Sequence, residues 1–69
     1  MLNVPVTLRE LRLQSGMTQI VVANQLGFAS SATISHYEVG HRDPSLHTFM
    51  RMIELYGKDL AIREVVDER

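Results

Sequence analysis

Four glycines divide most of the chain into short segments. Gly16, Gly27, Gly40 and Gly57 each follow a stretch whose apolar residues recur with the spacing of an α-helix. Glycine is favoured directly after a helix, because it accepts the left-handed backbone that ends the last turn. We therefore expect four short helices that end at these glycines.

Small hydroxyl residues mark where these helices begin. Thr7 fits a helix N-cap, and Glu10 three residues later completes a capping-box pattern. Thr18 and Ser45 are cap candidates for the second and fourth helices, and the third helix fits residues 31–38. This reading predicts an N-terminal arm over residues 1–6 and a helical domain over residues 7–57. The apolar positions of the first three expected helices are Leu8, Leu11, Leu13, Val22, Ala23, Leu26, Ile34 and Tyr37. The residues of the fourth helix expected to lie in the core are Leu46, Phe49, Met50, Met52, Ile53 and Tyr56.

The pattern changes after residue 57. In "DLAIREVV", Leu60, Ile62 and Val66 lie at even spacings, and Glu64 interrupts them. A period of two and β-branched content favour a strand within residues 58–69, and a fifth helix is the alternative.

The size of the chain limits how it can be stabilised. Its 69 residues contain no cysteine, so disulfides and thiolate zinc sites are excluded. The fold must then be stabilised by compact helix packing or by oligomerisation. No apolar run is long enough to span a bilayer, and "MLNVPVTLRE" lacks the features of a signal peptide. We expect a cytoplasmic protein with no membrane partner.

The charge balance disfavours a nonspecific nucleic-acid coat, because such a protein would be strongly basic. The net charge is −1 and the isoelectric point is about 6.2. The acidity lies late in the chain. Residues 1–42 carry three arginines against two glutamates, whereas residues 43–69 carry four cationic side chains against six carboxylates.

The stretch "LGFASSATISHYEVG" is rich in small hydroxyls, which are modest helix formers. The segments around it predict two helices and a tight turn from residue 18 to residue 38, the arrangement of a helix-turn-helix. Ile34 and Tyr37 would face inward. Ser31, Ala32, Ser35 and His36 would face outward, where short side chains allow a helix to approach base edges and phosphates closely.

The run "LRELRLQSGMTQ…LG…TISHYEVGHRDPSL" resembles the Xre/Cro/C1-type helix-turn-helix repressors from residue 7 to residue 57. The resemblance implies an all-α, compact, lambda-repressor-like fold of four to five helices, without a cofactor. It also implies a sequence-specific repressor that binds double-stranded DNA as a homodimer on a near-palindromic operator.

The resemblance also implies roles for individual residues. Gln19 matches a glutamine that contacts phosphate, Arg42 matches a basic loop position near phosphate, and Arg12 and Glu38 match a structural ion pair. Ile20 and Val21 occupy positions that are usually charged; they would be exposed, pack against the N-terminal arm, or meet a partner. The implied DNA-binding positions are Thr18, Gln19, Ser30, Ser31, Ala32, Thr33, Ser35, His36 and Arg42.

The tail supports a second function. "LYGKDLAIREVV" resembles the C-terminal strand of small antitoxins that pair with HipA-type kinases. That resemblance implies that Leu60, Ile62 and Val66 form a dimer interface and that a toxin kinase is a further partner. Such a protein would bind DNA, neutralise the toxin and autoregulate its operon.

Other classes of site are not supported. His36, His41 and His47 fall on a helix, a loop and another helix, with no cysteine nearby, so we expect no metal site. Ser35 and His36 are adjacent in a helix and point in different directions, so they do not form a catalytic pair. We expect no enzyme activity. A protein-interaction module without DNA binding is the remaining alternative, because a fold alone does not prove a function.

Overall fold

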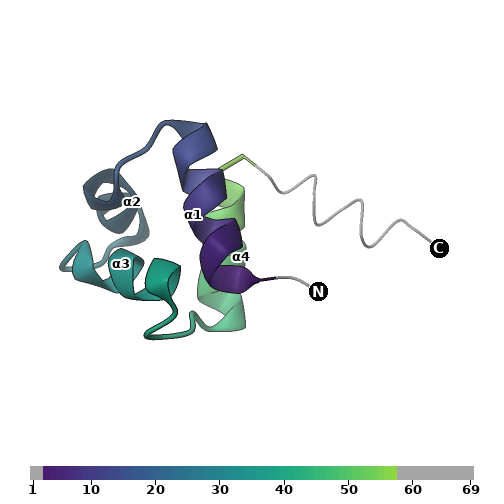
Figure 1. The fold of residues 1–69 in the computed structure, drawn as a ribbon. Coiled ribbons are helices and arrows are strands. Elements are labelled where there is room, and N and C mark those ends of the chain that lie inside the picture. The colour runs from purple at the N-terminus through teal and green to yellow at the C-terminus, as the bar shows by residue number, and fades with distance from the viewer. Residues whose placement is uncertain (1–2, 58–69) are drawn as a thin grey trace.

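A computed structural model describes residues 3–57, which form four α-helices (Figure 1). These are α1 (Val4–Ser15), α2 (Gln19–Leu26), α3 (Ala32–Val39) and α4 (Leu46–Leu55). Helices α1 and α4 lie side by side, and α2 and α3 form the other half of the molecule (Figure 1). The described part contains no strand, which confirms the all-α prediction there. The predicted strand and its residues Leu60, Ile62 and Val66 lie outside the described residues.

Three of the four glycines end helices as predicted, whereas α4 ends at Leu55, with Tyr56 as its cap. Gly16, Gly27 and Gly40 follow α1, α2 and α3 with φ angles of 75°, 79° and 85°. Residues with a Cβ rarely adopt this left-handed backbone. The amide of each glycine donates to a carbonyl in the last turn, so carbonyl groups that have no partner within the helix gain one from the glycine.

Two of the predicted N-caps also form. Thr18 Oγ1 accepts a hydrogen bond from the Val21 amide at 3.1 Å at the start of α2. Ser45 Oγ accepts one from the Thr48 amide at 3.1 Å at the start of α4. Each bond satisfies a backbone donor that has no partner within the helix.

The predicted start of α1 is wrong. The helix begins at Val4 rather than near Thr7, because Asn3 Oδ1 accepts a hydrogen bond from the Val6 amide at 3.2 Å and acts as the cap. Pro5 fits in the first turn, where no intrahelical amide donor is needed. Residues 4–6 therefore belong to the first helix.

Helix α3 begins one residue later than predicted, at Ala32. Ser31 occupies the cap position, but its side chain makes no capping hydrogen bond. The Ala32 amide instead donates to Ser30 Oγ at 3.0 Å. Ser30, in the turn before α3, therefore serves the start of the helix in place of Ser31.

All four helices contribute to one apolar core. Its fully enclosed centre contains Leu8 from α1, Val22 from α2, Ile34 from α3 and Met52 from α4. The buried set is Leu8, Val22, Ala23, Leu26, Ile34, Tyr37, Met52, Ile53 and Tyr56.

Two residues predicted to be in the core reach the surface instead. Leu46 is 76% exposed and Met50 is 37% exposed. Leu46 is the first residue of α4, nearly two turns before the buried part of that helix, and it lines an open groove with Val4 and Phe49. The helical period places these side chains on or near the apolar face, but the neighbouring helices do not cover them.

Candidate nucleic-acid interface

Helices α2 and α3 form the predicted helix-turn-helix. Gly27 ends α2, and the Phe28 amide donates back to the Ala23 carbonyl at 2.9 Å. The Phe28 ring then meets the edge of Tyr37 in α3, with centroids 6.4 Å apart and planes at 72°. This aromatic contact joins the turn to the inner face of α3.

Helix α3 has an inner and an outer side. Ile34 and Tyr37 are buried, as the sequence predicts. Ala32 is exposed, and Ser35 and His36 are half-buried. The outward side therefore carries small polar and apolar groups, a composition suited to close contact with base edges.

The remaining positions implied for DNA binding all reach the surface at least in part. They come from the start of α2, the turn before α3, the first turn of α3 and the loop after it. Thr18, Ser30 and Arg42 are exposed, and Gln19, Ser31 and Thr33 are half-buried.

The loop after α3 folds back against the C-terminal end of that helix. The amides of His41 and Arg42 donate to the His36 carbonyl, at 2.9 and 3.3 Å. The rings of His36 and His41 meet edge to face with centroids 5.7 Å apart. This contact places Arg42 next to α3.

Within residues 3–57, no three histidine, aspartate or glutamate side chains are grouped as a metal site.

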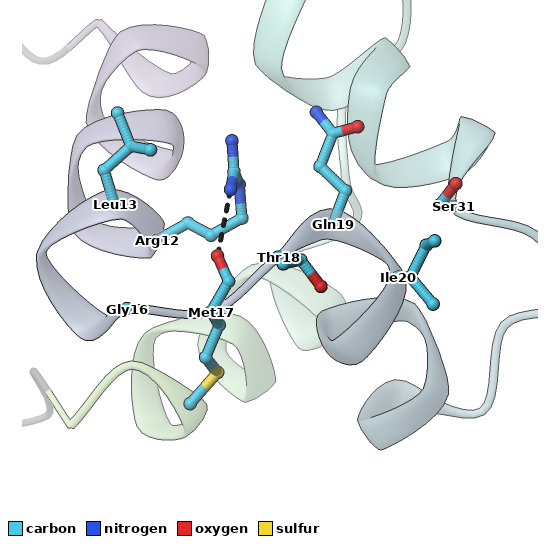
Figure 2. Close-up of a pocket in the computed structure, with 8 residues that line it drawn as sticks. All are labelled: Arg12, Leu13, Gly16, Met17, Thr18, Gln19, Ile20 and Ser31. Atoms are coloured by element: carbon cyan, nitrogen blue, oxygen red, sulfur yellow. Dashed lines mark hydrogen bonds between the residues drawn. The ribbon is translucent and has the colours of Figure 1, made fainter.

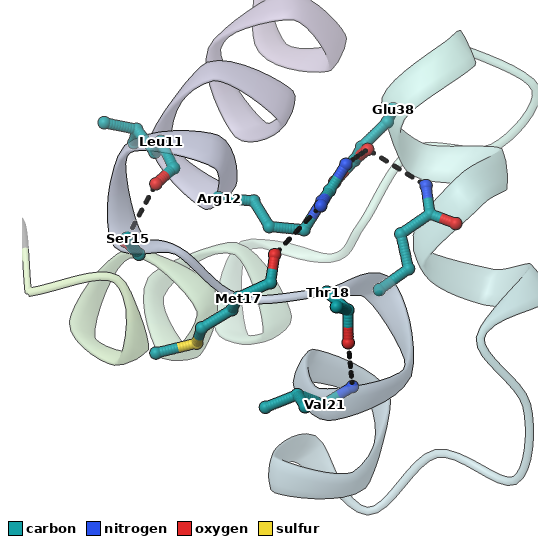
Figure 3. A network of polar contacts seen from close by, with 8 residues as sticks. Leu11, Arg12, Ser15, Met17, Thr18, Val21 and Glu38 are labelled. Atoms are coloured by element: carbon teal, nitrogen blue, oxygen red, sulfur yellow. Dashed lines mark hydrogen bonds and ion pairs between the residues drawn. The ribbon is translucent and has the colours of Figure 1, made fainter.

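Arg12 and Glu38, which the resemblance pairs, meet in the structure (Figure 3). Arg12 Nε donates to Glu38 Oε2 at 2.7 Å, and Arg12 Nη2 donates to Oε1 at 3.1 Å. Arg12 Nη1 also donates to the Met17 carbonyl at 3.0 Å. The guanidinium thus ties α1 to α3 and to the segment that leads into α2.

This pair is largely removed from water, with side-chain exposures of 11% for Arg12 and 2% for Glu38. The hydrogen bond to Glu38 raises the pKa of Arg12, and burial opposes that rise. A buried charge is costly unless it is paired and hydrogen-bonded. The two-pronged contact supplies both conditions, since it matches the planar guanidinium to the carboxylate.

Gln19 has a partner that the sequence does not reveal. Its Nε2 donates to Glu38 Oε1 at 3.1 Å. The same side chain lines a surface groove together with Thr18, Ile20 and Ser31 (Figure 2). The resemblance implies only a phosphate contact for this glutamine. No local pattern links residues 19 positions apart, and the sequence does not show that Glu38 is buried.

Tyr56 extends this polar region into the core. It is 4% exposed, and its hydroxyl has no hydrogen-bond partner among the described residues. Burial, followed by the nearby Glu38 carboxylate, raises the pKa of Tyr56 to about 12, and Arg12 opposes this rise. Ser15 Oγ lies 2.8 Å from the Leu11 carbonyl oxygen and 3.1 Å from the Tyr56 carbonyl oxygen, so its single proton is shared between them and the contact with Tyr56 links the end of α4 to α1.

The two β-branched residues at usually charged positions are exposed. Ile20 is 63% exposed and Val21 is 42% exposed, so neither packs into the core. Of the three possibilities that the sequence left open for Ile20 and Val21, the structure shows that both side chains are exposed.

No helix within residues 3–57 combines the length and apolar composition needed to cross a bilayer.

Comparison with known families finds that residues 8–62 match the helix-turn-helix family model HTH_3. Searches of curated proteins and of solved structures returned no match. The family match covers most of the chain and includes all four helices except the first turn of α1. The chain therefore belongs to the Xre/Cro/C1-type helix-turn-helix family, which identifies it as a DNA-binding transcription regulator.

Proposed function

We propose that this protein is a sequence-specific repressor that binds a near-palindromic operator as a homodimer. The outer surface of α3 carries this proposal. Ala32, Ser35 and His36 lie at or near the surface, while the opposite side of the helix is buried against the core. A helix held in this way can enter the major groove and present short side chains to base edges.

A dimer follows from the size of the unit. A single helix-turn-helix reads about half of an operator, and paired recognition helices read half-sites about 34 Å apart. We propose that Leu60, Ile62 and Val66 in the tail supply the dimer contacts. Occupying promoter DNA requires neither catalysis nor a cofactor, and we propose that the protein acts in the cytoplasm.

Fluorescence anisotropy with duplex DNA from upstream of the protein's own gene tests this function, with a scrambled duplex as the control. We expect two subunits per specific duplex and an affinity that falls steeply with salt, because phosphate contacts release counterions. If neither this duplex nor sequences selected from random DNA are preferred over the scrambled duplex, the repressor is excluded and a protein-interaction module becomes the better reading.

Variants of α3 locate the interface. Replacing Ser35 and His36 together by alanine should lower specific affinity about 10-fold or more, since each good base contact contributes on the order of 1–3 kcal/mol. His47→Ala is the matched control, because His47 is exposed on α4 and lies outside the proposed interface. Equal losses in the two proteins would place the DNA elsewhere.

The sequence "LYGKDLAIREVV" supports a second candidate function, an antitoxin that also binds a HipA-type kinase. This candidate shares the DNA-binding surface and adds a toxin partner. A kinase-like gene beside this one, whose product co-elutes with the protein in gel filtration, would support it. A purified neighbouring kinase that neither co-elutes with the protein nor loses activity in its presence would exclude it.

A further inference from the structure

The Glu38 carboxylate accepts hydrogen bonds from side chains of two other helices. Arg12 from α1 donates to both of its oxygens, and Gln19 from α2 donates to Oε1. Glu38 itself belongs to α3. One buried group therefore connects the three helices, and Gln19 supplies the α2 part of that connection.

Gln19 and Glu38 lie at opposite ends of the helix-turn-helix, so their hydrogen bond can influence how its two helices are oriented. Gln19 is the first residue of α2, and Glu38 is the last but one of α3. Their hydrogen bond joins the beginning of one helix of the helix-turn-helix to the far end of the other. The turn joins the opposite end of α2 to the beginning of α3, so the pair of helices is fastened at both ends.

We propose that Gln19 is a positioning residue that acts through Glu38 to set the orientation of α3 relative to α2. This inference rests on the proposed DNA-binding function, because the orientation of α3 matters for its fit to base edges. The residues that touch a ligand need a second layer of contacts to hold them in register, and small displacements weaken recognition. Gln19 belongs to α2 and supplies one such contact to α3 without being part of the outer surface of α3.

The contact can be removed without unfolding the domain. Helix α2 is anchored in the core by Val22, Ala23 and Leu26, and Arg12 still pairs with Glu38 when Gln19 is replaced. Gln19→Met keeps an unbranched side chain of similar length and loses the amide donors. Gln25→Met is the matched control, because Gln25 is an exposed residue of the same helix.

The first measurement needs no DNA. Backbone amide NMR spectra of the free protein should show that Gln19→Met shifts resonances along α3, including residues 35–39, whereas Gln25→Met leaves them in place. A change confined to the first turn of α2 would overturn the inference. This result is independent of whether the protein is a repressor.

The second measurement compares a duplex selected from random DNA with an unselected random duplex. A phosphate contact carries no sequence information, so losing it lowers both affinities by the same factor. A positioning residue changes their ratio. We expect Gln19→Met to lower the ratio of specific to nonspecific affinity by about 3- to 10-fold, which lies in the lower part of the range for coupled neighbours. An unchanged ratio with a uniform loss would assign Gln19 to phosphate contact alone and overturn the inference.

Discussion

The molecule has two centres that hold the same helices in different ways. In the apolar centre, Leu8, Ile34 and Met52 are fully enclosed. In the polar centre, Arg12 and Gln19 donate to the buried Glu38 carboxylate. Apolar burial is non-directional and depends on the area removed from water, whereas hydrogen bonds weaken steeply when their angles change. The apolar centre therefore supplies most of the stability, and the polar centre restricts the angles between helices.

Breaking the polar centre from one side should have the largest effect. Arg12→Ala leaves the Glu38 carboxylate buried without its cation, which should cost about 3–5 kcal/mol of unfolding free energy. Urea denaturation followed by circular dichroism measures this loss. Arg9→Ala is the control, since Arg9 is exposed on the same helix and should change stability by less than about 0.5 kcal/mol. Similar losses in the two variants would show that the buried pair does not stabilise the fold.

Truncating the apolar centre should have a comparable or slightly smaller effect. Ile34→Ala removes buried methyl groups and leaves a cavity, so we expect a loss of about 2–5 kcal/mol. Ile20→Ala removes the same groups from a side chain that is 63% exposed and should cost far less. Thermal unfolding of both variants makes the comparison. An Ile20→Ala loss as large as that of Ile34→Ala would contradict the burial assigned to these residues.

The helix caps provide a smaller test of local structure. Thr18→Ala removes the acceptor for the Val21 amide and should cost about 1 kcal/mol. Ser31→Ala should be nearly neutral, because the Ser31 side chain makes no capping bond although it occupies the cap position. Chemical denaturation distinguishes the two. If Ser31→Ala were the more costly change, the start assigned to α3 would be wrong.

Tyr56→Phe should have the smallest effect at neutral pH, and its sign should be positive. Among the described residues the buried hydroxyl has no hydrogen-bond partner, so removing it should raise stability by about 1 kcal/mol or less. Above about pH 10 the two proteins should diverge. Burial raises the pKa of Tyr56 to about 12 in the folded state, against about 10 when unfolded, so the unfolded state loses its proton first.

The stability of the wild-type protein should therefore be unaffected by this group below about pH 10 and should fall as the pH rises from about 10 to 12. Tyr56→Phe should lack this part of the loss, whereas Tyr37→Phe should retain it. Denaturation curves at several alkaline pH values measure the difference. Parallel losses in wild type and Tyr56→Phe would show that Tyr56 is not responsible.

Helix boundaries were predicted well where a local residue decides them. The glycines after α1, α2 and α3 and the caps at Thr18 and Ser45 act within one turn of the chain, so the sequence displays them directly. The start of α1 was missed because Thr7 and Asn3 are both acceptable caps. The earlier position forms in the structure, with Pro5 in the first turn.

Exposure was predicted less well, because it depends on distant neighbours. Leu46 and Met50 follow the helical apolar period of their segment, yet both lie at the surface. The sequence gives the direction of a side chain around its helix axis. It does not show where the facing helix ends, and that decides whether the side chain is covered.

Most helix ends, the order of the helices and the family could be predicted from the sequence, because they depend on local chemistry and on motifs in a fixed order. The packing of the helices in three dimensions brings Gln19 to the Glu38 carboxylate and leaves the Tyr56 hydroxyl without a hydrogen-bond partner among the described residues. Gln19 meets Glu38, and Tyr56 lies near Glu38, through the packing of α2, α3 and α4. Their contacts follow from helix angles and distances that no single segment of the sequence specifies.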